Sequence, residues 1–391
     1  MSGVRVVLLG GRSFPALLNL LYDAEHIDEV IVFSTYQRRR AIDEFTRIVP
    51  PSFVGRIRRE LIDAENFHRA FNRMHEIISS INGDISIDIT PAPKIPALAA
   101  WEVARELGAT IIYTSVSSTS QLRFSFRDRL RVSRIPLSTR LLNLDTYISL
   151  YGRSLVANER LHLPNLKKPV ERTAYEIGRY FIDRMNISID FLKFMRCLVS
   201  GKAEKDMIHV SYSPQQGRCK DIPFRREYAQ MLHFLHGMGV ISSLHIEGES
   251  VKFRIGVLEA GFISGKWLEY YIYRVLDGSG LFHDSRFSVE IPAAETRNEI
   301  DFIGIRRDKG WLYIVEAKTG RVNRRDLDTL DSVAHLIGGN AVVRYMVVFG
   351  RNLSSSLRAQ ARERRINLLS AEDLYPERLV ESISRPRFEP I

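Results

Sequence analysis

The first 150 residues alternate short apolar runs, rich in β-branched residues, with longer segments in which apolar residues recur every three or four positions. Runs of the first kind predict strands, and segments of the second kind predict helices. Because strands alternate with helices, the pattern predicts an α/β domain with a mostly parallel sheet covered on both faces. The expected helices are residues 14–24, 66–80 and 95–107, and the expected strands are residues 5–10, 29–34, 56–62, 85–90 and 110–115.

The pattern changes over residues 151–260, where helical segments precede two strands joined by a turn. This order predicts a small α+β module of the winged-helix type. The helix expected at residues 227–237 is mostly apolar, whereas base readout needs polar side chains that project into a groove. We therefore interpret the module as a connecting or dimerisation element rather than a DNA reader. Its other expected elements are helices at residues 171–185 and 189–200 and strands at residues 240–246 and 251–255.

The C-terminal part, residues 261–391, contains a second α/β pattern. Two apolar arms, residues 298–306 and 311–318, flank a polar loop, and this arrangement predicts a β-hairpin in which Arg306 pairs with Trp311. The elements expected after the hairpin are a helix, a strand, a basic helix and a short strand, at residues 326–337, 341–349, 357–365 and 366–369.

Carboxylates face one another across this expected hairpin. The antiparallel register places Asp301 opposite Glu316 and Glu299 opposite Lys318, and the period of two puts all four side chains on one face. Two carboxylates directly opposite each other repel. A divalent cation such as Mg²⁺ removes this penalty, because hard cations are held by carboxylates and substrate phosphate. Lys318 would then face the oxygen that gains charge during phosphodiester cleavage.

A helix expected at residues 265–276 precedes the hairpin, with Ser264 as its N-cap. Glu269 lies at the edge of its apolar stripe, where a half-buried carboxylate could point toward the same cation. The alternative interpretation is plainer. Glu269 could be an ordinary boundary residue, and a Glu-x-Lys pattern is common on a solvated strand face.

The order of Glu269, Asp301, Glu316 and Lys318 resembles the PD-(D/E)xK nucleases, which share the fold of restriction endonucleases. Ile300 stands where the motif has proline. The resemblance implies that Glu269, Asp301 and Glu316 hold Mg²⁺ or Mn²⁺. It also implies that Lys318 orients the attacking water or stabilises the pentavalent phosphate.

Candidate ligand-binding residues follow three strands of the first domain. In parallel sheets ligands bind outside the carboxyl ends of the strands. Small residues, hydroxyls and a lysine at helix starts suit a phosphate or a nucleotide. A dinucleotide cofactor fits less well, since Gly10 and Gly11 do not complete a G-x-G-x-x-G motif. The alternative is that βα turns simply use Gly, Pro and Ser. The candidates are Gly10, Gly11, Arg12, Ser13, Thr90, Pro91, Lys94, Ser115 and Ser117.

The turn at residues 90–94 and the alanine-rich helix after it resemble CARF domains, the Rossmann-like sensors of CRISPR systems. This resemblance implies a homodimer that binds one cyclic oligoadenylate across its two-fold axis, in a site lined by the nine residues named above.

The whole order is similar to the CARF–PD-(D/E)xK effectors of type III CRISPR systems. These are antiviral nucleases activated allosterically by cyclic tetra-adenylate. The expected domains are a sensor at residues 1–150, a connecting module at 151–260 and a nuclease at 261–391. Single-stranded RNA, single-stranded DNA and duplex DNA stay open as substrates. Two alternatives are a ligand-responsive DNA-binding regulator with an inert C-terminal domain and a DNA repair or restriction nuclease with an unrelated ligand domain.

Composition adds three expectations. A formal net charge of +10 over 391 residues favours a polyanionic partner such as nucleic acid. No apolar run is long enough to span a membrane, and the first residues predict a strand rather than a signal peptide, so we expect a cytoplasmic protein with no membrane partner. Cys197 and Cys219 lack a paired or zinc-like spacing, which suits a reducing compartment. We interpret the arginine-rich stretch from Arg123 to Arg140 as a solvated connecting face.

Overall fold

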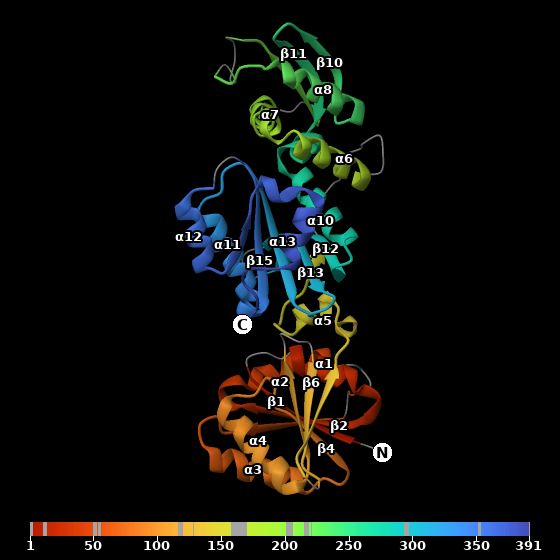
Figure 1. Ribbon diagram of the computed structural model, residues 1–391, viewed down its shortest axis with the longest axis vertical. Helices are drawn as coiled ribbons and strands as arrows, with labels where there is room; N and C mark the ends of the chain where they lie inside the picture. The colour runs from red at the N-terminus through yellow and green to blue at the C-terminus, as the bar shows by residue number, and fades with distance from the viewer. Residues whose placement is uncertain are drawn as a thin grey trace. The chain divides into compact units, whose positions relative to one another are not determined.

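The computed structural model describes residues 3–10, 14–49, 53, 56–115, 120–127, 129–157, 170–200, 206–214, 219, 221–292, 297–350 and 353–390. The chain divides into two compact units, each of which can be followed separately in Figure 1. The first unit comprises Met1–Ser154, Ile305–Trp311 and Leu336–Gly338, and the second comprises Leu155–Gly304, Leu312–His335 and Gly339–Ile391. Within the described residues, none of the helices has the length and hydropathy needed to cross a bilayer.

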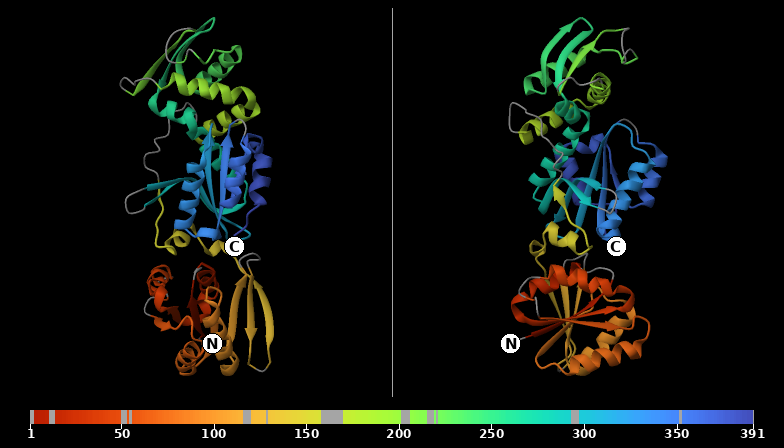
Figure 2. Two further views of the ribbon diagram at one scale, coloured as in Figure 1. Left: turned by 90° about the vertical axis from the view of Figure 1, so that its left-hand side faces the viewer. Right: turned by 180° about the vertical axis from the view of Figure 1, so that it is seen from behind.

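The first unit is organised around a seven-stranded sheet in the order β3-β2-β1-β4-β5-β6-β7. The first five strands are parallel, and β6 and β7 continue the sheet as an antiparallel hairpin at one edge (Figure 2). The predicted α/β fold with a parallel sheet is therefore confirmed. The strands are β1 (Gly3–Leu9), β2 (Ile27–Thr35), β3 (Ile57–Ile62), β4 (Asp84–Asp88), β5 (Thr110–Ser115), β6 (Ser120–Ser125) and β7 (Arg131–Pro136).

Helices cover both faces of this sheet, with α1 and α2 on one face and α3 and α4 on the other (Figure 1). Asn66 caps α3 by accepting a hydrogen bond from the backbone N–H of Arg69 at 3.0 Å, which explains why that helix begins where the sequence predicted. The helices are α1 (Phe14–Tyr22), α2 (Arg39–Ile48), α3 (Phe67–Ser79), α4 (Lys94–Leu107) and α5 (Leu144–Ser149), with 3-10 turns at Ala24–His26, Tyr36–Arg38 and Thr139–Leu141.

The arginine-rich stretch is a solvated face, as predicted, except at Arg123. Its other arginines are exposed to solvent: Arg127, Arg129, Arg131, Arg134 and Arg140. Part of it forms the hairpin β6–β7, and Arg123 on β6 turns inward to pair with Asp23. A cation can face the interior of a strand pair when a buried carboxylate neutralises it, and the local charge pattern does not reveal such a distant partner.

The second unit contains the elements of the middle module, which follow the short strand at Val156–Ala157. Three antiparallel strands in the order β10-β11-β9 accompany three helices. Tyr228, Met231, Leu232 and Leu235 of α8 are buried, so this helix faces the core as the sequence predicted. Assignment to the winged-helix type stays a prediction. The elements are α6 (Val170–Asp183), α7 (Met185–Leu198), β9 (Met207–Tyr212), α8 (Arg226–Met238), β10 (Ile241–Glu247) and β11 (Ser250–Gly256).

The two cysteines form a disulfide, so the expectation that they would be unpaired is wrong. Cys197 lies on α7 and Cys219 precedes α8, with their Cα atoms 5.9 Å apart. The chain after α7 returns along it as β9, where the rings of Phe194 and Tyr212 meet with centroids 5.1 Å apart. This reversal brings together residues whose separation of 22 in the sequence carried no signal.

The rest of the second unit is a six-stranded sheet in the order β16-β15-β14-β13-β12-β8. β14, β15 and β16 run parallel, and β8 pairs with β12 in the antiparallel sense. The strands are β8 (Val156–Ala157), β12 (Phe282–Pro292), β13 (Arg297–Arg306), β14 (Leu312–Thr319), β15 (Val342–Phe349) and β16 (Ile366–Leu369). The helices are α9 (Val257–Gly261), α10 (Trp267–Gly278), α11 (Arg324–Leu336), α12 (Ser355–Glu363) and α13 (Pro376–Ser384), with 3-10 turns at Gly339–Ala341 and Ala371–Leu374.

The middle module and this sheet are joined by the close packing of α6 on α10. A Cβ atom on Gly178 of α6 would lie 2.5 Å from the ring of Tyr271, so glycine is required for this approach. Tyr175 stacks on the same ring, with centroids 5.7 Å apart, and Phe181 contacts Trp267 edge-on at 5.0 Å. Large aromatic side chains therefore fix the position of α10.

Candidate active site

The helical segment that enters the site is longer than the sequence predicted. α9, a π-helical turn at Phe262–Lys266 and α10 follow one another directly. Ser264 is not an N-cap, because its hydroxyl donates to the carbonyl of Ala260 at 2.7 Å within the continuing helix. Single π-helical turns inside α-helices occur frequently at functional sites, and this one places Lys266 immediately before α10.

Asp301 lies at the centre of the site, on β13. The N–H of Arg306 donates to the carbonyl of Trp311 at 2.9 Å, which is the hairpin pairing predicted from the sequence. Asp301 is 6% exposed, and its Oδ2 accepts a hydrogen bond from the N–H of Ala317 on β14 at 2.7 Å. The hairpin thus fixes the Asp301 carboxylate against the segment that carries Glu316 and Lys318.

The four residues predicted from the sequence are brought together. An oxygen of Glu269 and an oxygen of Asp301 lie within 4.8 Å of each other. Glu316 Oε1 and Lys318 Nζ form an ion pair of 2.6 Å on the neighbouring strand. Glu269 is largely buried at the first turn of α10, so it is more than a solvated boundary residue.

Two further residues, Lys266 and Glu299, belong to the same cluster. Glu299 shares the 4.8 Å group of carboxylate oxygens with Glu269 and Asp301, and Ser288 Oγ donates to its Oε1 at 2.9 Å. Lys266 Nζ donates to Glu269 Oε2 at 2.8 Å and to Glu299 Oε1 at 2.6 Å. The register argument already placed Glu299 on this face. Lys266 was missed because it lies in the π-helical turn, where the expected periodicity fails.

Burial and like charges shift the pKa values of these carboxyl groups in one direction. Burial raises the pKa of Asp301 well above its usual value, and the charges of Glu316 and Glu269 raise it further. Burial likewise raises the pKa of Glu269, against the opposing effect of Lys266, and that of Glu316, against the opposing effect of Lys318. The cluster is therefore short of positive charge.

The donor set fits a hard divalent cation. Carboxylate oxygens are the ligands that Mg²⁺ and Mn²⁺ prefer, and a cation among them would relieve the repulsion that raises these pKa values. Glu269, Glu299 and Asp301 form the close group of oxygens in the structure, whereas the sequence predicted Glu316 in place of Glu299.

Both lysines of the site favour the charged ammonium form. Burial lowers the pKa of Lys266, but the carboxylates of Glu269 and Glu299 outweigh this effect and raise it above the usual value. The pKa of Lys318 is raised in the same way, because Glu316 outweighs burial. Near neutral pH each side chain can stabilise negative charge on a phosphate, whereas neither favours accepting a proton from water.

Arg196 ties the middle module to this site. Its Nη1 donates to the carbonyl of Thr319, the residue after Lys318, at 2.7 Å. The hydroxyl of Thr319 in turn donates to the carbonyl of Ser264 in the π-helical turn at 2.9 Å. This chain of contacts holds α7, the end of β14 and the π-helical turn in one arrangement.

A second candidate site lies in the first unit, at the carboxyl ends of β1 and β4. The chain leaves β1 toward β2 on one side and returns as β4 on the other, and such switch points are where open α/β sheets bind ligands. A Cβ atom on Gly10 would lie 1.7 Å from the carbonyl oxygen of Pro91, so the turns after these strands pack in direct contact. Lys94, exposed at the first position of α4, follows the same turn.

Not every predicted ligand-binding residue can be placed. Gly11, Arg12, Ser13 and Ser117 lie outside the described residues. Ser115 ends β5, next to β4 in the sheet. The hydroxyl oxygen of Thr90 accepts a hydrogen bond from the N–H of Thr114 at 2.9 Å, so this side chain contributes to the fold of the turn.

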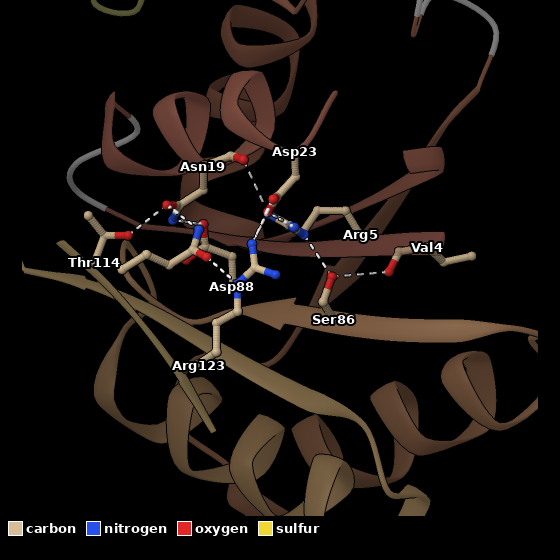
Figure 3. Close-up of polar contacts among 9 residues, drawn as sticks. Val4, Arg5, Asn19, Asp23, Ser86, Asp88, Thr114 and Arg123 are labelled. Carbon is tan, nitrogen blue, oxygen red and sulfur yellow. Dashed lines mark hydrogen bonds and ion pairs between the residues drawn. The ribbon is translucent and has the colours of Figure 1, made fainter. Parts of the chain in front are cut away.

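A buried polar network lies beneath this turn (Figure 3). Asp88 accepts from the N–H of Thr90 at 2.9 Å and from Asn19 Nδ2 at 2.6 Å. Asn19 Oδ1 accepts from the hydroxyl of Thr114 at 2.7 Å and from Gln121 Nε2 at 2.9 Å. Burial raises the pKa of Asp88, and its hydrogen bonds oppose that shift.

The network continues to an ion-paired group on the same unit (Figure 3). Arg5 on β1 donates to Asp23 Oδ2 at 2.5 Å, and Arg123 donates to both oxygens of Asp23, at 2.6 and 2.8 Å. Arg5 also donates to the hydroxyl of Ser86 at 2.8 Å. Each carboxylate of this network thus has several donors.

The geometry of the acidic cluster indicates a class of chemistry. An acidic cluster with a lysine, mounted on a helix and a β-hairpin of a mixed sheet, suits metal-assisted chemistry on phosphates. Residues 258–382 match the family described as Card1-like, endonuclease domain. The C-terminal domain is therefore similar to Card1-like endonuclease domains.

Solved structures extend this likeness to nearly the whole chain. Protein VC1899 from Vibrio cholerae superimposes with a TM-score of 0.79 at 17% identity, over 98% of both chains. Can2 from Sulfobacillus thermosulfidooxidans, solved in complex with cyclic tetra-adenylate, gives 0.75 at 17% identity, over 98% of this chain and 97% of Can2. A type III CRISPR defence DNA nuclease activated by cyclic oligoadenylate gives 0.57 at 13% identity, over 100% of this chain and 53% of that protein.

No curated protein matches the sequence. At these identities the solved structures establish the fold. The resemblance to CARF-domain nucleases predicted from the sequence is confirmed, by fold along the chain and by sequence in the C-terminal domain.

Proposed function

We propose that this protein is a metal-dependent endonuclease of type III CRISPR antiviral defence, switched on by cyclic tetra-adenylate bound to its first unit. One observation carries the proposal. Glu269, Asp301, Glu316 and Lys318, chosen from the sequence for phosphodiester chemistry, converge in a domain that matches an endonuclease family.

The metal site uses Asp301 and Glu269 together with Glu299, Glu316 or both. A divalent cation bound there would polarise the scissile phosphate and promote ionisation of the attacking water. Lys318 donates hydrogen bonds to the phosphate oxygen that gains charge as water attacks. Glu316 holds the Lys318 ammonium in place before substrate binds, through the 2.6 Å ion pair.

The activator is the ligand seen in the Can2 complex, a protein with the same fold. We place it at the switch point between β1 and β4, where Gly10, Pro91 and Lys94 gather. A ring of identical nucleotides is best matched by a two-fold symmetric pair of chains, so the active form is a homodimer, with each sensor domain supplying half of the site. We place the protein in the cytoplasm, where CRISPR defence operates.

Activation requires the ligand to distinguish two states of the dimer. Cyclic tetra-adenylate shifts the equilibrium toward the cleaving state by its difference in affinity for the two, and a preference of about 1–3 kcal/mol gives roughly 5- to 150-fold activation.

The test is cleavage of labelled single-stranded RNA, single-stranded DNA and duplex DNA with Mn²⁺ or Mg²⁺, with and without cyclic tetra-adenylate. We expect cleavage that depends on both metal and ligand. Cleavage without ligand would favour a repair or restriction nuclease, and tight duplex binding without cleavage would favour a regulator.

Substitutions of the candidate catalytic residues test whether they carry out cleavage. Glu316→Ala and Lys318→Ala should abolish cleavage and leave binding of cyclic tetra-adenylate intact. Lys252, exposed on β11, offers a matched lysine control, and Lys252→Ala should cleave normally. Near-normal cleavage by both site variants would disprove the assignment.

A further inference from the structure

The ammonium group of Lys266 lies among the carboxylates of the acidic cluster, where a metal ion would also bind. Its ammonium nitrogen lies 2.8 Å from Glu269 Oε2 and 2.6 Å from Glu299 Oε1, and both carboxylates belong to the group of oxygens within 4.8 Å of one another. The same group includes the buried carboxylate of Asp301. A positive charge is therefore already present where the proposed metal would bind.

We infer that Lys266 is an internal counter-ion that a divalent cation must displace, so that this side chain sets the metal concentration at which the nuclease works. The inference rests on the metal dependence proposed above. It adds a role for a residue outside the four assigned to cleavage.

Competition follows from the contacts themselves. A Mg²⁺ or Mn²⁺ ion held by Glu269 and Glu299 at roughly 2.0–2.2 Å would bind the same two carboxylates that the ammonium contacts. The ion is also repelled by the positive charge of the ammonium, which lies within hydrogen-bond distance of both carboxylates. The two cations cannot both keep these contacts.

The Lys266 side chain can move out of the cluster. It ends the π-helical turn, and its side chain is 33% exposed, so the ammonium has a path to solvent. Four rotatable bonds let a lysine head group move while its backbone stays fixed. When the ammonium leaves, Glu269 and Glu299 keep their positions, since Glu269 belongs to the buried first turn of α10 and Ser288 still donates to Glu299.

Lys318 provides the contrast. Its side chain has a similar exposure, 35%, and it pairs with Glu316 at 2.6 Å. Glu316 lies outside the close group of Glu269, Glu299 and Asp301. A cation held by these three carboxylates, without Glu316, therefore leaves the Lys318 pair in place, although each lysine contributes one positive charge to the same site.

The first experiment measures Mn²⁺ binding to the full chain by electron paramagnetic resonance of the free ion, without nucleic acid or activator. It compares the wild type with Lys266→Met and Lys318→Met, each of which removes one nearby charge. We expect Lys266→Met to tighten Mn²⁺ binding by about ten-fold or more and Lys318→Met to tighten it several-fold less.

Two other results of the Mn²⁺ measurement would contradict the inference. Weaker binding in Lys266→Met would show that the lysine organises the carboxylates for the metal, and equal effects of the two variants would show a general charge effect. Either result overturns the inference. If neither the wild type nor Lys266→Met binds Mn²⁺, the proposed metal dependence fails first, and the two failures are thereby distinguished.

A second measurement needs no variant. Acetic anhydride acetylates exposed lysines, and mass spectrometry gives the rate for each. In the wild type we expect Mg²⁺ to increase acetylation of Lys266 several-fold, with little change at Lys318 and none at Lys252, because the displaced ammonium loses its ion pairs. An unchanged rate at Lys266 with Mg²⁺ bound would refute displacement.

Discussion

The two units bury carboxylates in opposite ways. In the first unit, Asp23 is contacted by the guanidinium groups of Arg5 and Arg123, and Asp88 is held by neutral donors. In the second unit, Asp301 is surrounded by Glu269, Glu299 and Glu316. Burial of a charge is tolerated when partners satisfy it. The four carboxylates of the second unit share the ion pairs of Lys266 and Lys318, and burial together with mutual repulsion raises the pKa of Asp301. This excess of negative charge separates the candidate active site from the structural network of the first unit.

The largest expected effect tests the acidic cluster of the second unit. Asp301→Asn keeps an oxygen that can accept from the N–H of Ala317 but removes the charge needed for metal. We expect cleavage to fall by about 10³-fold. The melting temperature should rise at the same time, because a repelled buried charge is gone. A fall in both quantities would mean that Asp301 is a structural residue.

The second prediction tests the satisfied network. Asp23→Asn leaves the buried Arg5 without its charged partner, and we expect a loss of about 3–5 kcal/mol in the stability of the first unit. Urea unfolding monitored by hydrogen exchange of the β1 peptide measures this loss. The exposed pair of Arg59 and Asp43 is the matched control, and Asp43→Asn should cost less than about 1 kcal/mol.

The third prediction concerns the effect of a divalent metal ion on the stability of the second unit. Mg²⁺ or Mn²⁺ at about 100 times its dissociation constant should stabilise the second unit by roughly 2.7 kcal/mol, because it binds the folded cluster. Thermal unfolding with and without metal measures the shift, and EDTA should reverse it. The same shift in Asp301→Asn would place the metal elsewhere.

The smallest effect concerns the turn above the satisfied network. Thr90→Val removes the oxygen that accepts from the N–H of Thr114, and we expect a loss of about 1 kcal/mol in stability. Because this bond holds the turn that carries Pro91 and Lys94, we also expect activator binding to weaken several-fold. Thr90→Ser keeps the acceptor and should bind normally. Isothermal titration with cyclic tetra-adenylate compares the variants, and equal affinities would separate this bond from the ligand site.

Sequence reasoning worked best where the periodicity was local. The period of two and the Arg306–Trp311 pairing sufficed to place Asp301 against the segment of Glu316 and Lys318. The alternation of strands and helices sufficed for the parallel sheet of the first unit. In both cases neighbouring residues carried the information.

The features that were missed depend on contacts between distant residues or on irregular helix geometry. The π-helical turn shifts the helical period, so nothing in the spacing pointed to Lys266 as a cluster member. Arg123 is drawn inward by Asp23, 100 residues earlier in the chain. Cys197 and Cys219 meet because β9 reverses along α7, a reversal that composition does not encode.

The glycine contact between α6 and α10 also decides where the protein can be divided. Gly178 leaves no gap above Tyr271, and Phe181 covers Trp267. A fragment that starts at α9 would present both aromatic rings to water and favour aggregation. A fragment that begins before α6 keeps them covered, so the smallest fragment that keeps the candidate active site intact includes the helices of the middle module.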